Sequence, residues 1–227
     1  MIKGLIFDLD GVIVNTEKNH FLAWKQIASE LDVFFSEKEN ELLKGISRRD
    51  SLNVILKLAK ISLSETKINS LLNKKNELYR SSVSNLNKSD ILDGVEDLLV
   101  KLKNQNISLA IGSSSKNALF ILDKLKLTNY FNVIVDGNMV TKQKPSPEVF
   151  EKASNYMNLS PKECIVFEDS ASGVKAAKEG GFKVVGVGNE NIRFLADDYL
   201  NSMKEFNLSE YESCLLYTSP SPRDVRS

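Results

Sequence analysis

Two aspartates, Asp8 and Asp10, end an apolar run close to the start of the chain. The run, Ile2–Phe7, has the length and composition of a buried strand, and Gly11 follows the second aspartate. One carboxylate can attack phosphorus to form an aspartyl phosphate, and the other can serve as general acid and base. Carboxylates this close repel each other unless a cation shares them, and oxygen ligands suit Mg²⁺. The alternative is an acidic turn without chemistry.

A second acidic pair, Glu168–Asp169, ends the apolar run that starts at Cys164. Together with Asp8 this pair supplies enough oxygens for Mg²⁺, which water and phosphate would complete. The alternative is a helix N-terminus, where acidic residues are favoured, and both can hold at once.

Two further positions could handle a phosphate. Ser113 ends the apolar segment that starts at Ile107, and a small hydroxyl with free backbone amides can hold a phosphate oxygen. Taken alone, Ser113 is better explained as a helix N-cap. Lys144, in a Lys-Pro-Ser-Pro stretch, could neutralise charge on a transferring phosphoryl group, although a surface lysine is the simpler alternative.

The elements that must position these residues alternate between strand and helix over about residues 91–190. This alternation predicts an α/β fold, a doubly wound parallel sheet with helices on both faces. Strands are expected at 107–113, 131–135, 164–168 and 183–187, and helices at 95–102, at 117–125, from Pro147 onward and at 171–178. Because parallel strands present their carboxyl ends at one edge, the acidic pairs and Ser113 should converge there.

Residues 16–86 carry helical patterns and no strand pattern. Thr16 is expected to cap a first helix, and Ser36 with Glu39 forms a capping box for a second that stops at Gly45. Two more helices follow, the last one opened by Ser64. The predicted division is an α/β core of residues 1–15 and 88–213, with an inserted α-helical cap domain of residues 16–87.

The composition excludes several classes of partner. The 227 residues contain 30 Lys plus Arg and 30 Asp plus Glu, so no basic face for nucleic acid or a membrane surface is expected. No apolar run reaches the length of a membrane span, and no leader pattern is present. Cys164 and Cys214 form no disulfide framework, so a cytoplasmic protein is expected. Residues 214–227 differ in style from the rest and resemble a translated sequencing-adapter remnant, a non-native tail.

The motifs around Asp8 and Asp10, Ser113, Lys144 and Glu168–Asp169 resemble, in order and spacing, those of the haloacid dehalogenase superfamily. The resemblance implies a Rossmann-like core with Asp8 as nucleophile, Asp10 as acid and base, and Ser113 as a phosphate ligand. It selects Lys144 rather than Lys142 as the charge-neutralising lysine. It also implies Mg²⁺ held by Asp8, the backbone carbonyl of Asp10, Glu168 and Asp169.

The cap segment is similar to that of the superfamily's sugar phosphomutases. The resemblance makes Thr16 a hinge residue, and makes His20 the link between cap closure, Asp10 and substrate. Arg48 would grip the phosphate that is not being transferred. The bland alternatives are a structural histidine and a solvated basic helix start. Other implied substrate-binding residues are Trp24, Lys44, Gly45, Ser47, Lys75 with Asn76, Ser114, Ser115, Lys116 and Asn117.

The implied reaction interconverts β-D-glucose 1-phosphate and glucose 6-phosphate. An aspartyl phosphate would form, with β-glucose 1,6-bisphosphate as intermediate and activator and Mg²⁺ as cofactor. Small-molecule sugar phosphates are the expected partners, and a monomer is expected. One alternative is a Mg²⁺-dependent phosphatase of sugar phosphates with the same core. Another is a non-catalytic sugar-phosphate sensor, which the intact acidic residues disfavour.

Overall fold

A six-stranded parallel sheet forms the centre of the computed structural model, which describes residues 1–209 and 211. The strand order is β3-β2-β1-β4-β5-β6. The α/β fold class, with its doubly wound sheet, is therefore confirmed. The predictions for Cys214 and for residues 214–227 lie outside the described residues. The strands are β1 Gly4–Phe7, β2 Ser108–Gly112, β3 Val133–Val135, β4 Cys164–Glu168, β5 Lys183–Val187 and β6 Asp198–Leu200.

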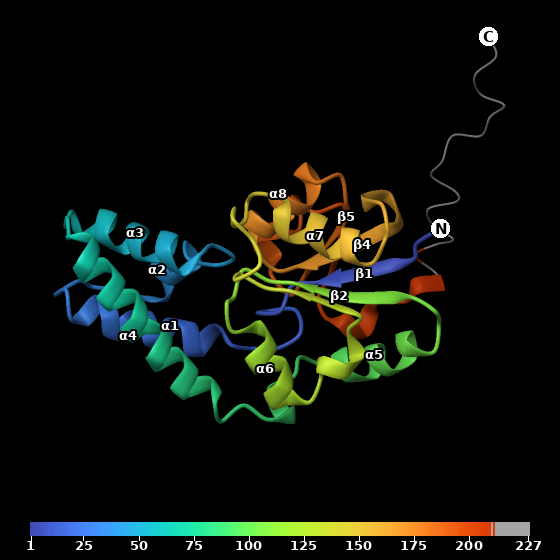
Figure 1. The fold of residues 1–227 in the computed structure, drawn as a ribbon, viewed down its shortest axis with the longest axis horizontal. Helices are drawn as coiled ribbons and strands as arrows, with labels where there is room; N and C mark the ends of the chain where they lie inside the picture. Colours follow the sequence, from blue (N-terminus) through green and yellow to red (C-terminus); the bar gives the residue numbers. More distant parts are fainter. Residues whose placement is uncertain (210, 212–227) are drawn as a thin grey trace, which may run out of the picture.

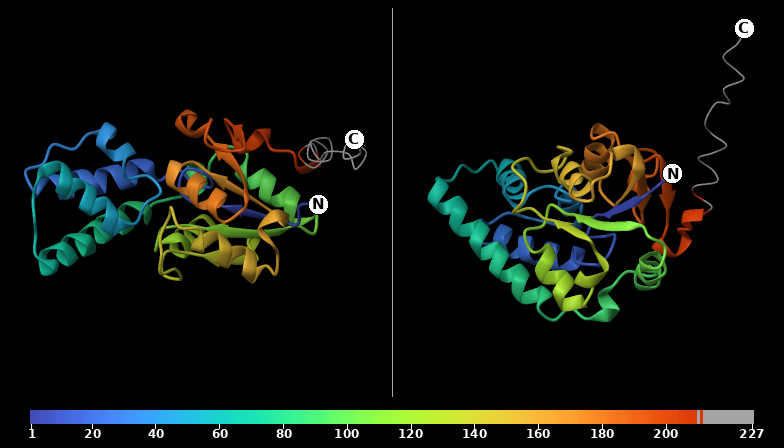
Figure 2. Two further views of the ribbon diagram at one scale, coloured as in Figure 1. Left: turned by 90° about the horizontal axis from the view of Figure 1, so that it is seen from above. Right: turned by 45° about the vertical axis from the view of Figure 1, so that its right-hand side comes forward.

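Helices cover both faces of this sheet, as Figures 1 and 2 show. Side chains alternate along β1: Leu5 and Phe7 pack into one core with helices α5 (Val95–Lys103) and α6 (Ala118–Leu125). Ile6 points into a second core with helices α7 (Glu148–Tyr156) and α8 (Ala171–Glu179). Because β1 is buried on both sides, its carboxyl end is held rigidly. The aspartates that follow it therefore sit on a fixed platform.

Four helices between β1 and α5 pack on one another beside the sheet, at the left of Figure 1. They are α1 Glu17–Ser29, α2 Glu37–Glu41, α3 Arg48–Ala59 and α4 Glu65–Val83. They enclose a hydrophobic core of their own, to which Trp24, Leu52 and Leu71 belong. The capping box of Ser36 and Glu39 and the Ser64 cap of α4 are present as predicted. We take residues 16–87 as the cap domain.

Two local predictions are wrong, and one strand was not predicted. The Thr16 hydroxyl makes no helix-capping hydrogen bond and contacts Asp10 instead. Helix α2 ends at Glu41, before Gly45. Strand β6 was not expected, because it has only three residues and none of them is fully buried. Short 3₁₀ turns also occur, at Lys88–Asp90, Thr128–Tyr130, Pro161–Glu163, Glu190–Ile192 and Met203–Glu205.

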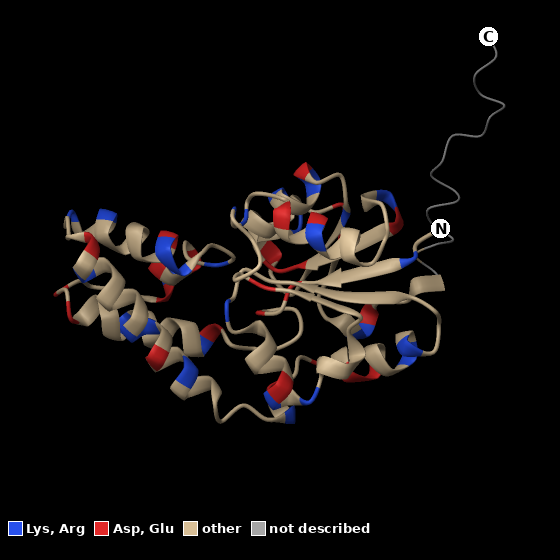
Figure 3. Cartoon of the chain, viewed as in Figure 1, with Lys and Arg blue, Asp and Glu red and all other residues tan. Residues whose placement is uncertain are grey.

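The strand order reverses direction between β1 and β4, which pair with each other in the middle of the sheet. Crevices at such switch points, beyond the carboxyl ends of the strands, are where open α/β sheets bind ligands. Figure 3 shows acidic residues gathered at these strand ends, on the side that faces the four helices. No helix within residues 1–209 is long and apolar enough to cross a membrane.

Candidate active site

A cavity of about 410 Å³ lies between the carboxyl edge of the sheet and the cap. The strand ends place Asp8, Asp10 and Asp169 on its floor. Most of the predicted site residues reach it, while Thr16, Lys144 and Glu168 do not line it. From the cap come His20, Trp24, Lys44, Gly45, Ser47, Arg48 and Lys75, and from the core Ser113, Ser114, Ser115, Lys116 and Asn117.

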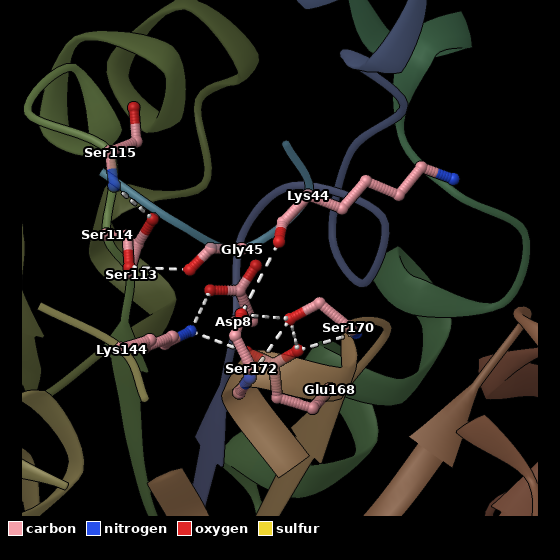
Figure 4. A network of polar contacts seen from close by, with 11 residues as sticks. Asp8, Lys44, Gly45, Ser113, Ser114, Ser115, Lys144, Glu168, Ser170 and Ser172 are labelled. Carbon is pink, nitrogen blue, oxygen red and sulfur yellow. Dashed lines mark hydrogen bonds and ion pairs between the residues drawn. The ribbon is translucent and has the colours of Figure 1, made fainter. Parts of the chain in front are cut away.

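A buried ammonium bridges the two acidic strand ends (Figure 4). Lys144 Nζ donates to Asp8 Oδ1 and to Glu168 Oε1, each at 2.5 Å, and its side chain is fully buried. Burial opposes its charge, but the two carboxylates outweigh burial and raise the pKa of Lys144. The Lys144 side chain therefore keeps a permanent positive charge next to Asp8. The choice of Lys144 over Lys142, which is exposed, fits this geometry.

Burial makes the ionised form of Asp8 costly. Burial, reinforced by Glu168 and Asp10 and opposed by Lys144, raises its pKa to about 7. A carboxylate with a pKa this high is nucleophilic but easily protonated. An additional positive charge nearby would restore its ionised form near neutral pH.

Glu168 and Asp169 play different parts in the geometry. Both Glu168 oxygens are occupied, one by Lys144 and the other by the backbone amide and hydroxyl of Ser170, each at 2.9 Å. The Asp169 carboxylate has no hydrogen bond or ion pair with any described residue. Burial, Glu168 and Asp8 raise the pKa of Asp169 well above its usual value. Asp169 is thus an acid that faces the cavity without a direct counter-ion, and Lys44 and Lys144 lower its pKa only from a distance.

The floor of the cavity requires glycine at position 11. Gly11 has φ +82°, and a Cβ there would lie 2.1 Å from Asp169 Oδ2. Asp8, Asp169 and the backbone around Asp10 fit a hard divalent cation, because they supply oxygens and an excess of negative charge. No group of three candidate side-chain ligands is drawn together within the described residues. Direct ligation by Glu168 stays a prediction, because Lys144 and Ser170 already hold its oxygens.

The side chain of Asp10 faces the cap. Its Oδ1 accepts a hydrogen bond from Thr16 Oγ1 and one from Tyr79 OH at 3.4 Å, and His20 Nε2 lies 3.9 Å away. Burial raises the pKa of Asp10, against these hydrogen bonds. An acid with a raised pKa, oriented by three neighbours, is suited to exchange protons with a hydroxyl. Tyr79 belongs to no recognised motif, although it lies four residues after Lys75 on the same helix face.

Lys75 and His20 form a buried pair behind Asp10. Lys75 Nζ lies 3.0 Å from His20 Nδ1 and packs over the rings of Trp24 and Tyr79. Burial and Arg48 lower the pKa of Lys75 to about 7, and burial with Lys75 lowers that of His20 well below its usual value. A neutral imidazole that accepts from Lys75 at Nδ1 carries its proton on Nε2, the nitrogen 3.9 Å from Asp10.

In the loop after β2, serine hydroxyls accept hydrogen bonds from backbone amides of the same loop. Ser113 Oγ accepts from the amide of Ser115 at 3.0 Å, and Ser115 Oγ accepts from the amide of Asn117 at 3.3 Å. Ser113 is not the N-cap of α6, because that position belongs to Asn117. The N-cap explanation of Ser113 is therefore wrong. The Ser113 hydroxyl is thus buried, and Ser113 lines the same cavity as Asp8.

The neighbouring residues Arg48 and Arg49 have different side-chain partners. Arg48 donates to Asn76 Oδ1 at 2.8 Å inside the cavity wall, and burial lowers its pKa. Arg49 instead forms a two-point ion pair with Glu65, at 2.6 and 2.8 Å, with an exposed side chain. Both arginines line the cavity, but the guanidinium of Arg49 is held by Glu65, which leaves Arg48 as the arginine to meet a ligand.

Two predicted cap contacts are already engaged within the protein. Lys44 Nζ pairs with Glu17 and Glu41, at 2.9 and 2.8 Å, and Figure 4 shows it pointing away from Asp8. The Ser47 hydroxyl caps helix α3 and donates to Asp50. A sugar would therefore have to compete for both. Only Glu17 is far from Lys44 in the chain; Glu41 and Asp50 lie three residues from Lys44 and Ser47, a spacing that could have indicated both contacts.

One short loop of the cap, around Gly45, hydrogen-bonds with the core. Ser114 Oγ donates to Gly45 O at 3.3 Å, and Ser172 Oγ donates to Lys44 O at 3.4 Å. A Cβ at Gly45, where φ is +70°, would lie 2.2 Å from the Ser170 hydroxyl. The glycine therefore allows the cap loop to close down onto the core (Figure 4).

We expect Asp169→Asn to raise the melting temperature in EDTA at pH 8, by roughly 2–4 °C. The folded protein holds the Asp169 proton more tightly than the unfolded chain does, so ionisation lowers the free energy of unfolding as pH rises. Asparagine removes this loss, and the difference should vanish toward pH 4. Mg²⁺ should stabilise the wild type but not the variant. Equal stabilisation of both, with Asp97→Asn as control, would contradict this assignment.

The chain is similar to proteins named as a phosphomutase and as a phosphatase. Residues 5–187 match the family model described as haloacid dehalogenase-like hydrolase. A Bacillus subtilis (strain 168) beta-phosphoglucomutase is 40% identical over 209 residues, which cover 91% of this chain and 92% of the relative. A Thermotoga maritima phosphorylated carbohydrates phosphatase is 32% identical over 192 residues, with 82% and 85% covered. A crystal structure of beta-phosphoglucomutase from Clostridium difficile superposes with a TM-score of 0.90 at 35% identity, and covers 94% of this chain and 96% of that one.

Proposed function

The chain belongs to the haloacid dehalogenase-like hydrolase family, and we propose that it interconverts β-D-glucose 1-phosphate and glucose 6-phosphate. The observation that carries the proposal is the pairing of Asp8 and Asp10 with a cap that brings Arg48 to the same cavity. A phosphatase needs only the two aspartates, whereas a mutase must also hold the second end of a bisphosphate. The 40% identity to the Bacillus mutase supports the same conclusion.

In the proposed mechanism Asp8 attacks the phosphoryl group and carries it as an aspartyl phosphate. Asp10 gives a proton to the departing sugar oxygen and takes one from the hydroxyl that later attacks. The Lys144 ammonium compensates charge on the phosphoryl oxygens, and the Ser113 hydroxyl and nearby amides orient them. Asp8, Asp169 and the backbone carbonyl of Asp10 would hold Mg²⁺, which when bound adds positive charge beside these oxygens.

The cap meets the second requirement of a mutase, because it keeps the sugar phosphate bound while the sugar reorients. After the first transfer the bound sugar carries two phosphates, as β-glucose 1,6-bisphosphate, and must present its other end to Asp8. Arg48 would hold whichever phosphate is remote from Asp8. The loop contacts at Gly45 keep water away from the aspartyl phosphate while this happens. His20 and Thr16 would orient Asp10 only when the cap is in place.

A sugar-phosphate phosphatase is the second candidate function. The Thermotoga relative, a phosphatase at 32% identity, favours it. The two functions differ in one physical property, which is how long the aspartyl phosphate survives before water hydrolyses it. The distinction is therefore kinetic.

Dependence on a primer tests the proposal. A mutase whose Asp8 must already carry phosphate turns over β-glucose 1-phosphate slowly until a trace of β-glucose 1,6-bisphosphate is added. We expect a lag that disappears with the primer, in the presence of Mg²⁺. A phosphatase would show no lag and no acceleration, and that result would refute the mutase.

We expect Arg48→Ala to reduce mutase turnover about 100-fold, because a charge-assisted grip on the remote phosphate is lost and the sugar is misplaced. Arg49→Ala is the matched control, since Arg49 also lines the cavity but its guanidinium pairs with Glu65. The control should keep nearly full activity. Intact mutase turnover in Arg48→Ala would exclude Arg48 from the site.

A further inference from the structure

We propose that Arg80, an exposed residue near the end of α4, is a positioning residue that fixes the side-chain amide of Asn117 for donation into the cavity. The phosphate that would accept this hydrogen bond is the one remote from Asp8, so the inference rests on the proposed function. Arg80 touches neither the cavity nor the reacting groups, and it acts through Asn117 alone.

Two cap residues, one helical turn apart on α4, hold the amide of Asn117 between them. Arg80 Nη1 donates to Asn117 Oδ1 at 3.1 Å. Asn117 Nδ2 donates to Asn76 Oδ1 at 3.0 Å. The same Asn76 oxygen also accepts from Arg48, at 2.8 Å. A continuous chain of hydrogen bonds thus joins Arg80 to the arginine that faces the ligand.

The guanidinium decides which way the amide points. Arginine has only donors, so it can bind the oxygen end of Asn117 and would repel the nitrogen end. The amide nitrogen then lies at the opposite end, where one of its two protons goes to Asn76 and the other is left for the cavity, whose wall Asn117 forms in part. Asn117 is 5% exposed, so water offers little competition for its orientation. Phosphate oxygens are acceptors only, so a cavity-facing N–H is the end they need.

Arg80 is itself held in place by the core. Its guanidinium carbon lies 4.3 Å from the centroid of the Phe120 ring, on helix α6, one turn beyond Asn117. The arginine therefore binds two groups of one core helix while it belongs to a cap helix. This geometry exists only when cap and core are together, so Asn117 is oriented in the closed arrangement.

Binding measurements in an Asp8→Asn background test the inference without turnover. Trp24 is the only tryptophan in the chain and lines the cavity, so its fluorescence reports binding of β-glucose 1,6-bisphosphate. Arg80→Met keeps an apolar stem on Phe120 but loses the donor, and its Kd should rise about fivefold, the value of one net hydrogen bond. Arg80→Lys, which keeps a donor, should recover most of the loss. Lys124→Met, which loses a charge 5.7 Å from the same ring, should bind like the parent.

A double-mutant cycle with Asn117→Ala decides whether Arg80 acts through Asn117. In that background Arg80→Met should have no further effect on Kd. Additive losses, an unchanged Kd in Arg80→Met alone, or no binding by the parent would overturn the inference. If the binding data show this coupling but the wild-type enzyme releases only free phosphate, the inference stands and the mutase proposal fails.

Discussion

Asp8→Asn is expected to lower turnover of β-glucose 1-phosphate by about 10⁵- to 10⁶-fold, as removal of a nucleophile does. Asparagine has nearly the same shape, so the hydrogen bond to Lys144 at the end of β1 can be kept. What is lost is the oxygen that would form the aspartyl phosphate. The measurement is glucose 6-phosphate formation at saturating primer and Mg²⁺.

The control for Asp8→Asn is Asp97→Asn, an exposed change in the first turn of α5. Its activity should equal that of the wild type. The Asp8→Asn variant should also fail to incorporate label from ³²P-labelled bisphosphate. Turnover within about tenfold of the wild type, or label retained on the variant protein, would place the nucleophile elsewhere.

Lys144→Ala is expected to reduce turnover about 1,000-fold, because the fixed positive charge next to the phosphoryl group disappears. It should also destabilise the protein, by about 3–5 kcal/mol, since Asp8 and Glu168 would be left buried without their shared cation. Lys142→Ala, two residues away and exposed, is the matched control and should change neither property.

A double variant separates the catalytic from the structural part of Lys144. Lys144→Ala with Glu168→Gln removes one unpaired charge, and the melting temperature should rise toward that of the wild type. Turnover should stay low, because the ammonium is still absent. Recovery of turnover together with stability would mean that Lys144 acts only as a structural counter-ion.

The core of the site could be predicted from the sequence because its logic is local. Asp8, Ser113 and Glu168 each follow an apolar run, and the parallel order of the strands places all three ends on one edge. Burial on both sheet faces makes such runs easy to recognise. The helix starts at Ser36 and Ser64 were predictable for the same reason, since a cap and its partner are three residues apart.

The cap side could not be predicted in the same way, because its partners are set by packing. Thr16 looked like a helix cap, yet its hydroxyl is drawn to Asp10. Lys44 is held by Glu17 and Glu41, and nothing in the spacing of Lys44 and Glu17 indicates that pair. Arg80 carried no motif at all, and only the approach of α4 to α6 gives it a role.

The most direct test of the central claim follows two products in one reaction. The wild-type protein is incubated with Mg²⁺, β-glucose 1-phosphate and a trace of β-glucose 1,6-bisphosphate, and glucose 6-phosphate and free phosphate are measured together. We predict that glucose 6-phosphate greatly exceeds free phosphate, and that the α-anomer gives no product. Free phosphate as the main product would contradict the account and make the protein a sugar-phosphate phosphatase.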